Sequence, residues 1–157
     1  MRRVVVTGLG VVSSIGNDAA EVTASLREAK SGISFSSDFA EHGFKCQVWG
    51  SPKLGSAELA ELVDRRAMRF LSQGGAWNHV AMKQALADSG LEEKDYSANE
   101  RTGIIMGSGG PSTRTLIEAA EITIKNSSPK RIGPFAVPKA MSSTASATLP
   151  LGLRSTA

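Results

Sequence analysis

The sequence is poor in the residues that build metal sites and disulfide frameworks. Its 157 residues contain one cysteine, Cys46, and two histidines, His42 and His79, which lie far apart. A single cysteine excludes a disulfide within the chain, and the spacing of the histidines is unlike a zinc-binding pattern. We therefore expect no metal site and no cofactor.

Long apolar runs and stripes of like charge are also missing. No stretch approaches the roughly 20 apolar residues of a membrane span. The apolar start at Val4 is interrupted by Thr7, Gly8 and Gly10, and no signal-peptide cleavage site follows it. The net charge of +3 comes without the interleaved basic and aromatic residues of a nucleic-acid binder. We expect a cytoplasmic protein that binds neither membranes nor nucleic acids.

What is present is the composition of a folded protein. Apolar residues make up 41% of the chain and charged residues 21%, which is ordinary for a globular domain. A chain of this length buries roughly 68–70% of the surface that it exposes when unfolded. One domain with its own hydrophobic core is therefore expected.

Two short apolar segments, Val4–Val6 and Ile104–Met106, lack polar alternation. Such segments are typical of strands that are buried on both faces. The second segment leads into the glycine loop Gly107–Gly110, whose backbone can approach a ligand or another chain closely. Helical patterns surround these strands at 18–30, 64–89, 113–125 and 139–149. The sequence therefore predicts an α/β fold in which helices cover a buried sheet.

Local signals set several of the predicted boundaries. Asp18 and Glu21 have the spacing of a capping box at the start of the first helix. Gly90 is placed to end the second helix. Residues 31–60 are predicted to be irregular, apart from a short strand at 45–49.

Two candidate sites have weak signals. Gly8 and Gly10 follow a predicted strand as in a dinucleotide-binding loop, but Ser13 stands where the third glycine of that motif belongs. A small nucleotide-binding protein is therefore one alternative. Cys46 has neither a helix N-terminus nor a histidine beside it in the sequence, so a structural thiol is favoured over a nucleophile.

Three arginines, Arg65, Arg66 and Arg69, cluster where the helix at 64–89 begins. A helix N-terminus disfavours cations, so the helix itself does not explain the cluster. It is either a solvated surface or a docking patch for an acidic partner.

Several motifs are familiar when they are taken together: Val5–Asn17, Val48–Gly50, Asp64–Arg66 with Arg69 and Phe70, Gly107–Gly110, and Ile132–Phe135 with Lys139–Met141. They resemble the β-ketoacyl-acyl-carrier-protein synthases, the condensing enzymes of fatty-acid synthesis, and within them synthase I. The resemblance runs from residue 1 to 149. The segment Ser72–Val80 departs from the family's usual sequence.

The resemblance implies a partial thiolase-like fold, that is, the N-terminal half with an incomplete mixed sheet and covering helices. It also implies a homodimer and an acyltransferase activity. Members of the family transfer an acyl chain to a cysteine, decarboxylate malonyl-carrier protein and condense the two. Cys46 matches no catalytic position of the family. We therefore assign no catalytic residue and expect this chain alone to be inactive.

The resemblance carries over residues for substrate and partner binding. It implies that three residues contact the acyl substrate: Gly110, Phe135 and Met141. It implies that three others form a patch for the acidic acyl carrier protein, which favours docking for the arginine cluster: Arg66, Arg69 and Lys130. A non-catalytic module that binds the carrier protein is the main alternative.

The sequence also predicts a boundary. Residues 1–149 correspond to the N-terminal part of the synthase domain, whereas Pro150–Ala157 do not match it. Removing one base from a possible coding of the family's continuation gives these eight residues. We therefore expect a tail that is translated in a shifted reading frame.

Overall fold

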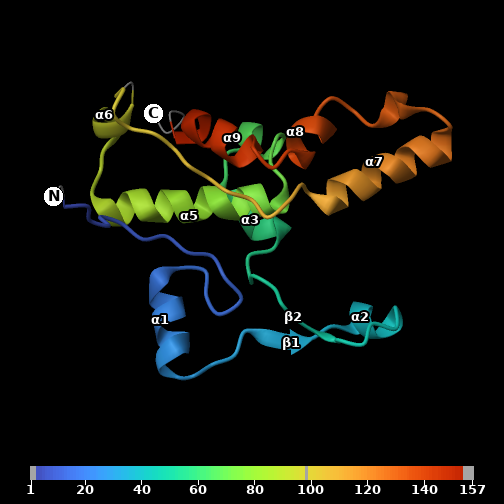
Figure 1. Ribbon diagram of the computed structural model, residues 1–157, viewed down its shortest axis with the longest axis horizontal. Helices are drawn as coiled ribbons and strands as arrows, with labels where there is room; N and C mark the ends of the chain where they lie inside the picture. The colour runs from blue at the N-terminus through green and yellow to red at the C-terminus, as the bar shows by residue number, and fades with distance from the viewer. Residues whose placement is uncertain (1–2, 98, 154–157) are drawn as a thin grey trace.

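The structure, a computed structural model, describes residues 3–97 and 99–153. The helix α5 (Gln73–Ser89) lies along the long axis of the molecule (Figure 1). On one side of it lie α8 (Ala136–Ala140) and α9 (Thr144–Leu153). The N-terminal segment and α1 (Ala19–Arg27) lie on the other side. α7 (Thr113–Asn126) extends away from α5 toward one end of the molecule.

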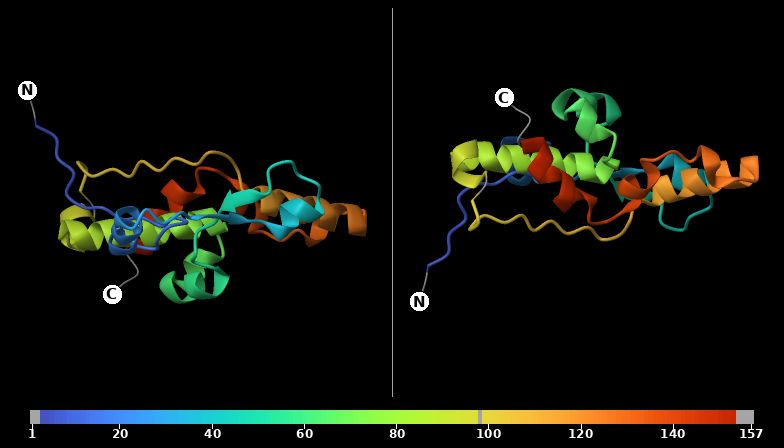
Figure 2. Two further views of the ribbon diagram at one scale, coloured as in Figure 1. Left: turned by 90° about the horizontal axis from the view of Figure 1, so that it is seen from below. Right: turned by 90° about the horizontal axis from the view of Figure 1, so that it is seen from above.

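Two further layers lie above and below this arrangement. The short helices α3 (Ser56–Leu62) and α4 (Arg65–Met68) project from one face of α5. The extended chain that leads from α6 (Glu93–Tyr96) to α7 runs along the opposite face (Figure 2). α5 thus lies between these layers, and α3 and α9 pack against it.

The hydrophobic core lies where α3, α4 and α5 meet. Its buried members are Leu54, Leu59, Val63, Leu71, Ala76 and Val80. Two residues of α9, Ala145 and Leu149, are also buried, and α9 packs against α5. Burial of such side chains is the main force that holds these helices together.

The first helix confirms its capping prediction in part. Asp18 accepts a hydrogen bond from the Glu21 N–H at 2.8 Å, and the Glu21 side chain accepts one from the Asn17 N–H at 2.8 Å. Asp18 therefore caps the helix as predicted, whereas Glu21 reaches back to the N–H of the residue before the cap and not to the Asp18 N–H that a capping box requires. The helix ends at Arg27, earlier than predicted, and Ala29 takes a left-handed φ of 52°.

The predicted helix over 64–89 is two helices, so this prediction was wrong. Asp64 caps α4, and the chain leaves the helical conformation before Ser72, which caps α5 by accepting from the Gly75 N–H at 3.2 Å. Gly74 and Gly75 thus lie in the first turn of α5 and not in the interior of a helix. The end at Gly90 is confirmed, because this residue adopts φ 70°.

Residues 31–60 are more regular than predicted. β1 (Ile33–Phe35) pairs antiparallel with β2 (Val48–Gly50), with Ser34 opposite Trp49. The helix α2 (Ser37–Glu41) lies between the two strands in the sequence. Phe39 stacks on Phe44 at 5.1 Å between ring centroids and lies 6.0 Å from Trp49. We call the segment from β1 through α2 to β2 the arm. Contacts between aromatic rings hold it together, and a pattern along the sequence does not reveal them.

The two predicted buried strands are not formed, which corrects the sequence-based expectation. Val4–Val6 and Ile104–Met106 are extended, yet neither belongs to the two-stranded sheet of the described residues. Val4 is 91% exposed and Ile105 is 99% exposed. A strand exists only when a neighbour accepts and donates its backbone hydrogen bonds. For these segments the local sequence is suitable, but the described residues supply no strand that pairs with them.

The segment that follows Val6 lies directly on α5. A Cβ placed on Gly8 would collide with the carbonyl oxygen of Ala85, and one placed on Gly10 would collide with that of Ala81. Side chains of α5 also bind the segment, since Asp88 accepts from the Leu9 N–H at 2.8 Å. Glycine at these positions therefore permits close packing of a backbone against a helix.

The last predicted helix, 139–149, is also divided. α8 ends at Ala140, Met141 is extended, and α9 begins at Thr144. The Thr144 hydroxyl donates to the carbonyl oxygen of Pro138, which joins the two helices. α9 continues past Leu149 to Leu153.

Candidate functional site

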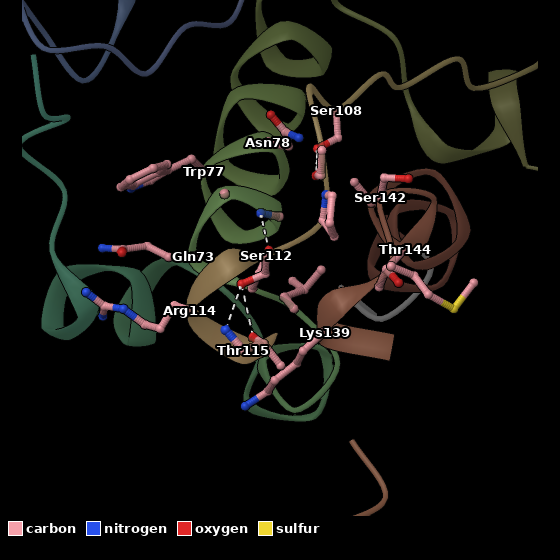
Figure 3. A pocket seen from close by; sticks show the side chains of 18 of the residues that line it. Gln73, Trp77, Asn78, Ser108, Ser112, Arg114, Thr115, Lys139, Ser142 and Thr144 are labelled. Atoms are coloured by element: carbon pink, nitrogen blue, oxygen red, sulfur yellow. Dashed lines mark hydrogen bonds between the residues drawn. The ribbon is translucent and has the colours of Figure 1, made fainter. Parts of the chain in front are cut away.

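A groove of about 690 Å³ lies between α5, the glycine loop and the start of α7 (Figure 3). This volume falls within the range of small-molecule sites. Polar and charged side chains from several elements line it, and Figure 3 labels among them Gln73, Asn78, Ser108, Arg114, Lys139 and Ser142. Leu59, Leu71 and Trp77 contribute apolar surface from the core side.

The glycine loop forms one open wall of the groove. Gly107, Gly109 and Gly110 have no atom within 4 Å of the position where a Cβ would lie. The Ser108 hydroxyl donates to the Gly110 carbonyl oxygen at 2.8 Å, within the loop itself. The loop thus presents backbone and open space to the groove.

Another wall of the groove comes from the link between α8 and α9. Met141 lines the groove and is 52% exposed. The Ser112 N–H donates to the carbonyl oxygen of Ala140 at 3.2 Å, which ties the start of α7 to this link. Gly110 and Met141, two of the predicted substrate residues, are therefore brought to one groove.

The third predicted substrate residue, Phe135, lies in a neighbouring cavity of about 210 Å³. Thr115, Glu118 and Lys139 line both cavities, so the two are adjacent. Phe135 packs edge-on against Phe70, with 5.2 Å between ring centroids.

The predicted docking residues lie on two elements. Arg66 is in α4 and Arg69 directly follows it, and both are exposed. Lys130 is exposed in η1 (Pro129–Arg131), which packs against α7. The contact between Phe70 and Phe135 joins the chain next to Arg69 with the segment that follows η1.

Hydrogen bonds at the start of α4 act on the charge of Asp64. The backbone N–H groups of Ala67 and Arg66 donate to its carboxylate, and they lower the pKa of Asp64. The negative charge is thereby held at the helix N-terminus, next to the arginines that the helix alone disfavours.

Cys46 and the histidines stand apart from the groove. Cys46 is exposed and its thiol donates to the Val48 carbonyl oxygen at 3.8 Å. His79 is 1% exposed, and its two ring nitrogens have no hydrogen-bond partner among the described residues. Burial lowers the pKa of His79, as does the nearby Lys83.

The remaining site predictions concern metals and membranes. Within residues 3–97 and 99–153, no three of the side chains that bind metals come together in a possible metal site. No helix of the described part is long and apolar enough to cross a bilayer.

Sequence patterns missed several groove residues. Trp77 and Asn78 lie in the segment that departs from the family's sequence, and they reach the groove because α5 begins at Gln73. Arg114 gave no signal of its own, although its place just after the Ser112 cap puts it at the groove's edge. Recognising from the sequence that a new helix begins after Ser72 could have placed Trp77 and Asn78 at the groove.

Comparison with known proteins identifies the family. Residues 1–156 match the family described as "Beta-ketoacyl synthase, N-terminal domain". The chain is 45% identical over 149 residues to 3-oxoacyl-[acyl-carrier-protein] synthase 1 of Escherichia coli (strain K12). This alignment covers 95% of the chain and 36% of the relative. The chain thus spans about a third of the length of this curated relative.

Solved structures agree on the fold. The ishigamide ketosynthase/chain length factor superposes with a TM-score of 0.79 at 25% identity, over 96% of this chain and 36% of its own. A second match is a type II polyketide-synthase acyl-carrier protein in complex with its ketosynthase bound to the hexaketide. Its TM-score is 0.68 at 21% identity, over 94% and 37% of the two chains. The predicted α/β class and partial thiolase-like fold are therefore confirmed, and the chain belongs to the β-ketoacyl synthase family.

Proposed function

We propose that this chain forms the acyl-binding and carrier-protein-binding part of a 3-oxoacyl-[acyl-carrier-protein] synthase that elongates fatty acids. The 45% identity to the Escherichia coli synthase 1 carries the proposal. The groove that Gly110 and Met141 share supports it, because an acyl chain needs such a partly apolar recess.

The proposed reaction is a decarboxylative Claisen condensation. An acyl group is first transferred from its thioester to a cysteine thiolate, and the carrier sulfur leaves as thiolate. The malonyl thioester then loses carbon dioxide, and the resulting enolate attacks the acyl thioester carbonyl. The product is a 3-oxoacyl thioester, and the enzyme cysteine leaves as thiolate.

Within this reaction we assign substrate binding, and no catalytic step, to the described residues. Cys46 lies on the arm with β1 and β2 and does not line the groove. A nucleophile needs a group that activates it, and the described contact of this thiol is to the Val48 carbonyl oxygen. The condensing nucleophile of the proposed synthase is therefore not Cys46.

The acidic acyl carrier protein is the proposed partner. The solved ketosynthase complex with an acyl-carrier protein supports this type of partner. Exposed Arg66, Arg69 and Lys130 supply positive charge on the surface, and complementary charges accelerate and orient association. Homodimerisation and a cytoplasmic location belong to the same proposal. The exposed thiol of Cys46 suits a reducing compartment.

Carrier-protein binding tests the docking surface. Surface plasmon resonance at low and physiological salt would measure the affinity of the chain for an acyl carrier protein. We expect Arg66→Glu with Arg69→Glu to weaken binding by about three- to thirtyfold, since each rim charge contributes up to about 1 kcal/mol. Arg27→Glu, on the far side of the molecule at the end of α1, is the matched control. Equal affinity of all variants, or binding that ignores salt, would exclude this docking surface.

Binding of the acyl group in the groove distinguishes a synthase from a non-catalytic module that only binds the carrier protein. A module that only binds the carrier protein has no need of an acyl site, so its affinity would be the same for acylated and unacylated carrier protein. The synthase proposal predicts tighter binding of the acylated form, lost in Met141→Glu, which places a charge in the wall of the groove.

A further inference from the structure

We propose that Ser112 is a positioning residue that sets the separation between the glycine loop and Met141, and thereby the length of acyl chain that the groove accepts. This inference rests on the proposed function. Ser112 would affect which acyl-chain lengths bind by positioning the glycine loop and the link that carries Met141. It would not contact the reacting atoms.

The first observation is that the glycine loop is not held by packing. Gly107, Gly109 and Gly110 face open space at their Cβ positions. The bond from Ser108 to Gly110 lies within the loop, so it shapes the loop without fixing its place in the molecule. Gly110 lies two residues before Ser112, so the position of Ser112 constrains that of Gly110.

The second observation is the junction two residues further on. The Ser112 N–H donates to the Ala140 carbonyl oxygen at 3.2 Å, and Ala140 directly precedes Met141. One hydrogen bond thus joins the end of the glycine wall to the start of the Met141 wall. A displacement of Ser112 changes the width of the groove between them.

The third observation is that the Ser112 side chain is itself fixed. Its oxygen accepts from the Thr115 N–H at 3.4 Å and pairs with the Thr115 hydroxyl at 3.0 Å (Figure 3). Thr115 is buried and lines both cavities. Because Ser112 caps the 14-residue helix α7, its N–H points at Ala140 from a rigid base.

The other side of the junction is anchored as well. The Thr144 hydroxyl donates to the Pro138 carbonyl oxygen and holds α8 to the start of α9. Thr144 is buried. The Met141 wall is therefore fixed at both ends of its link, and Ser112 supplies a hydrogen bond between this link and the segment that follows the glycine loop.

A distance measurement tests the junction without reference to any ligand. Nitroxide labels would be placed at Gly109→Cys and Ser142→Cys in a Cys46→Ser background, and their dipolar broadening measured. We expect Ser112→Ala to broaden the distance distribution and Ser112→Thr, which keeps the hydroxyl, to restore it. Thr123→Ala, which removes a hydroxyl bond to the Ala119 carbonyl oxygen within α7 and away from the junction, is the control and should leave the mean distance unchanged.

A binding series tests the consequence. Fatty acids of graded length with a terminal bromine would quench Trp77, a groove residue, in a Trp49→Phe background where it is the single tryptophan. We expect Ser112→Ala and Thr115→Val to change the ratio of affinities for the longest and shortest chains by about two- to tenfold, the worth of one hydrogen bond. Ser112→Thr should keep the original ratio.

The outcomes separate the inference from the proposed function. If the unsubstituted chain does not bind fatty acids, both the acyl groove and the length claim are overturned. If it binds them and the variants weaken all lengths equally, or the label distance stays fixed, the groove stands and the role of Ser112 is refuted. A changed ratio with a changed distance supports the inference.

Discussion

Replacing Gly10 with alanine should detach the N-terminal segment from α5. The new Cβ would meet the Ala81 carbonyl oxygen and would lie 2.7 Å from the Ala85 nitrogen. Both obstacles are helix backbone, which cannot rotate aside as a flexible side chain can. The segment must therefore move away from the helix.

Three hydrogen bonds depend on the position of this segment. Asp88 accepts from Leu9 at 2.8 Å, Gln84 accepts from Val11 at 3.0 Å, and Gln84 donates to Asn17 at 2.7 Å. Each contributes roughly 0.5–1.5 kcal/mol. Their loss should lower the free energy of unfolding by about 3 kcal/mol, which is large for a protein of this size.

Urea unfolding followed by Trp77 fluorescence in the Trp49→Phe background would measure this change. Gly109→Ala is the matched control, because a Cβ there meets open space, and it should stay within about 0.5 kcal/mol of the parent. A Gly10→Ala variant as stable as the control would refute the predicted clash with α5.

Stabilisation of the parent by NAD(P) or ATP would favour the nucleotide-binding alternative, which this packing opposes.

Three further predictions concern single residues. His79 has a folded-state pKa below its unfolded value, so the unfolded state takes up its proton first and stability should fall as the pH drops below about 6.5. Melting temperatures between pH 8 and pH 5 should show this fall, and His79→Leu should flatten it; Lys83 and Asp64 are the charges that act on this ring. Leu59→Ala, at a side chain 1% exposed, should cost about 2–5 kcal/mol in urea unfolding, and a cost under about 1 kcal/mol would contradict the assigned core. Incubation with an acyl-carrier protein thioester should leave no acyl adduct on Cys46 by mass spectrometry, and an adduct that Cys46→Ser abolishes would overturn this expectation.

The sequence by itself determined the features whose partners lie a few residues away. The Asp18 cap, the end at Gly90 and the helix over 113–125 follow from contacts that span three or four residues. The family was also accessible, because its motifs are linear and run through almost the whole chain.

Tertiary structure alone decided the features whose partners are distant in sequence. Gly8 and Gly10 meet α5 more than 70 residues away, so their role in helix packing could not be separated locally from that of a nucleotide loop. Val4–Val6 and Ile104–Met106 have the composition of strands, but strand formation requires a paired neighbour, and neither segment has one within the described residues. The groove likewise exists because α5, α7 and the α8–α9 link converge, and these elements are far apart in the sequence, so no single segment predicts it.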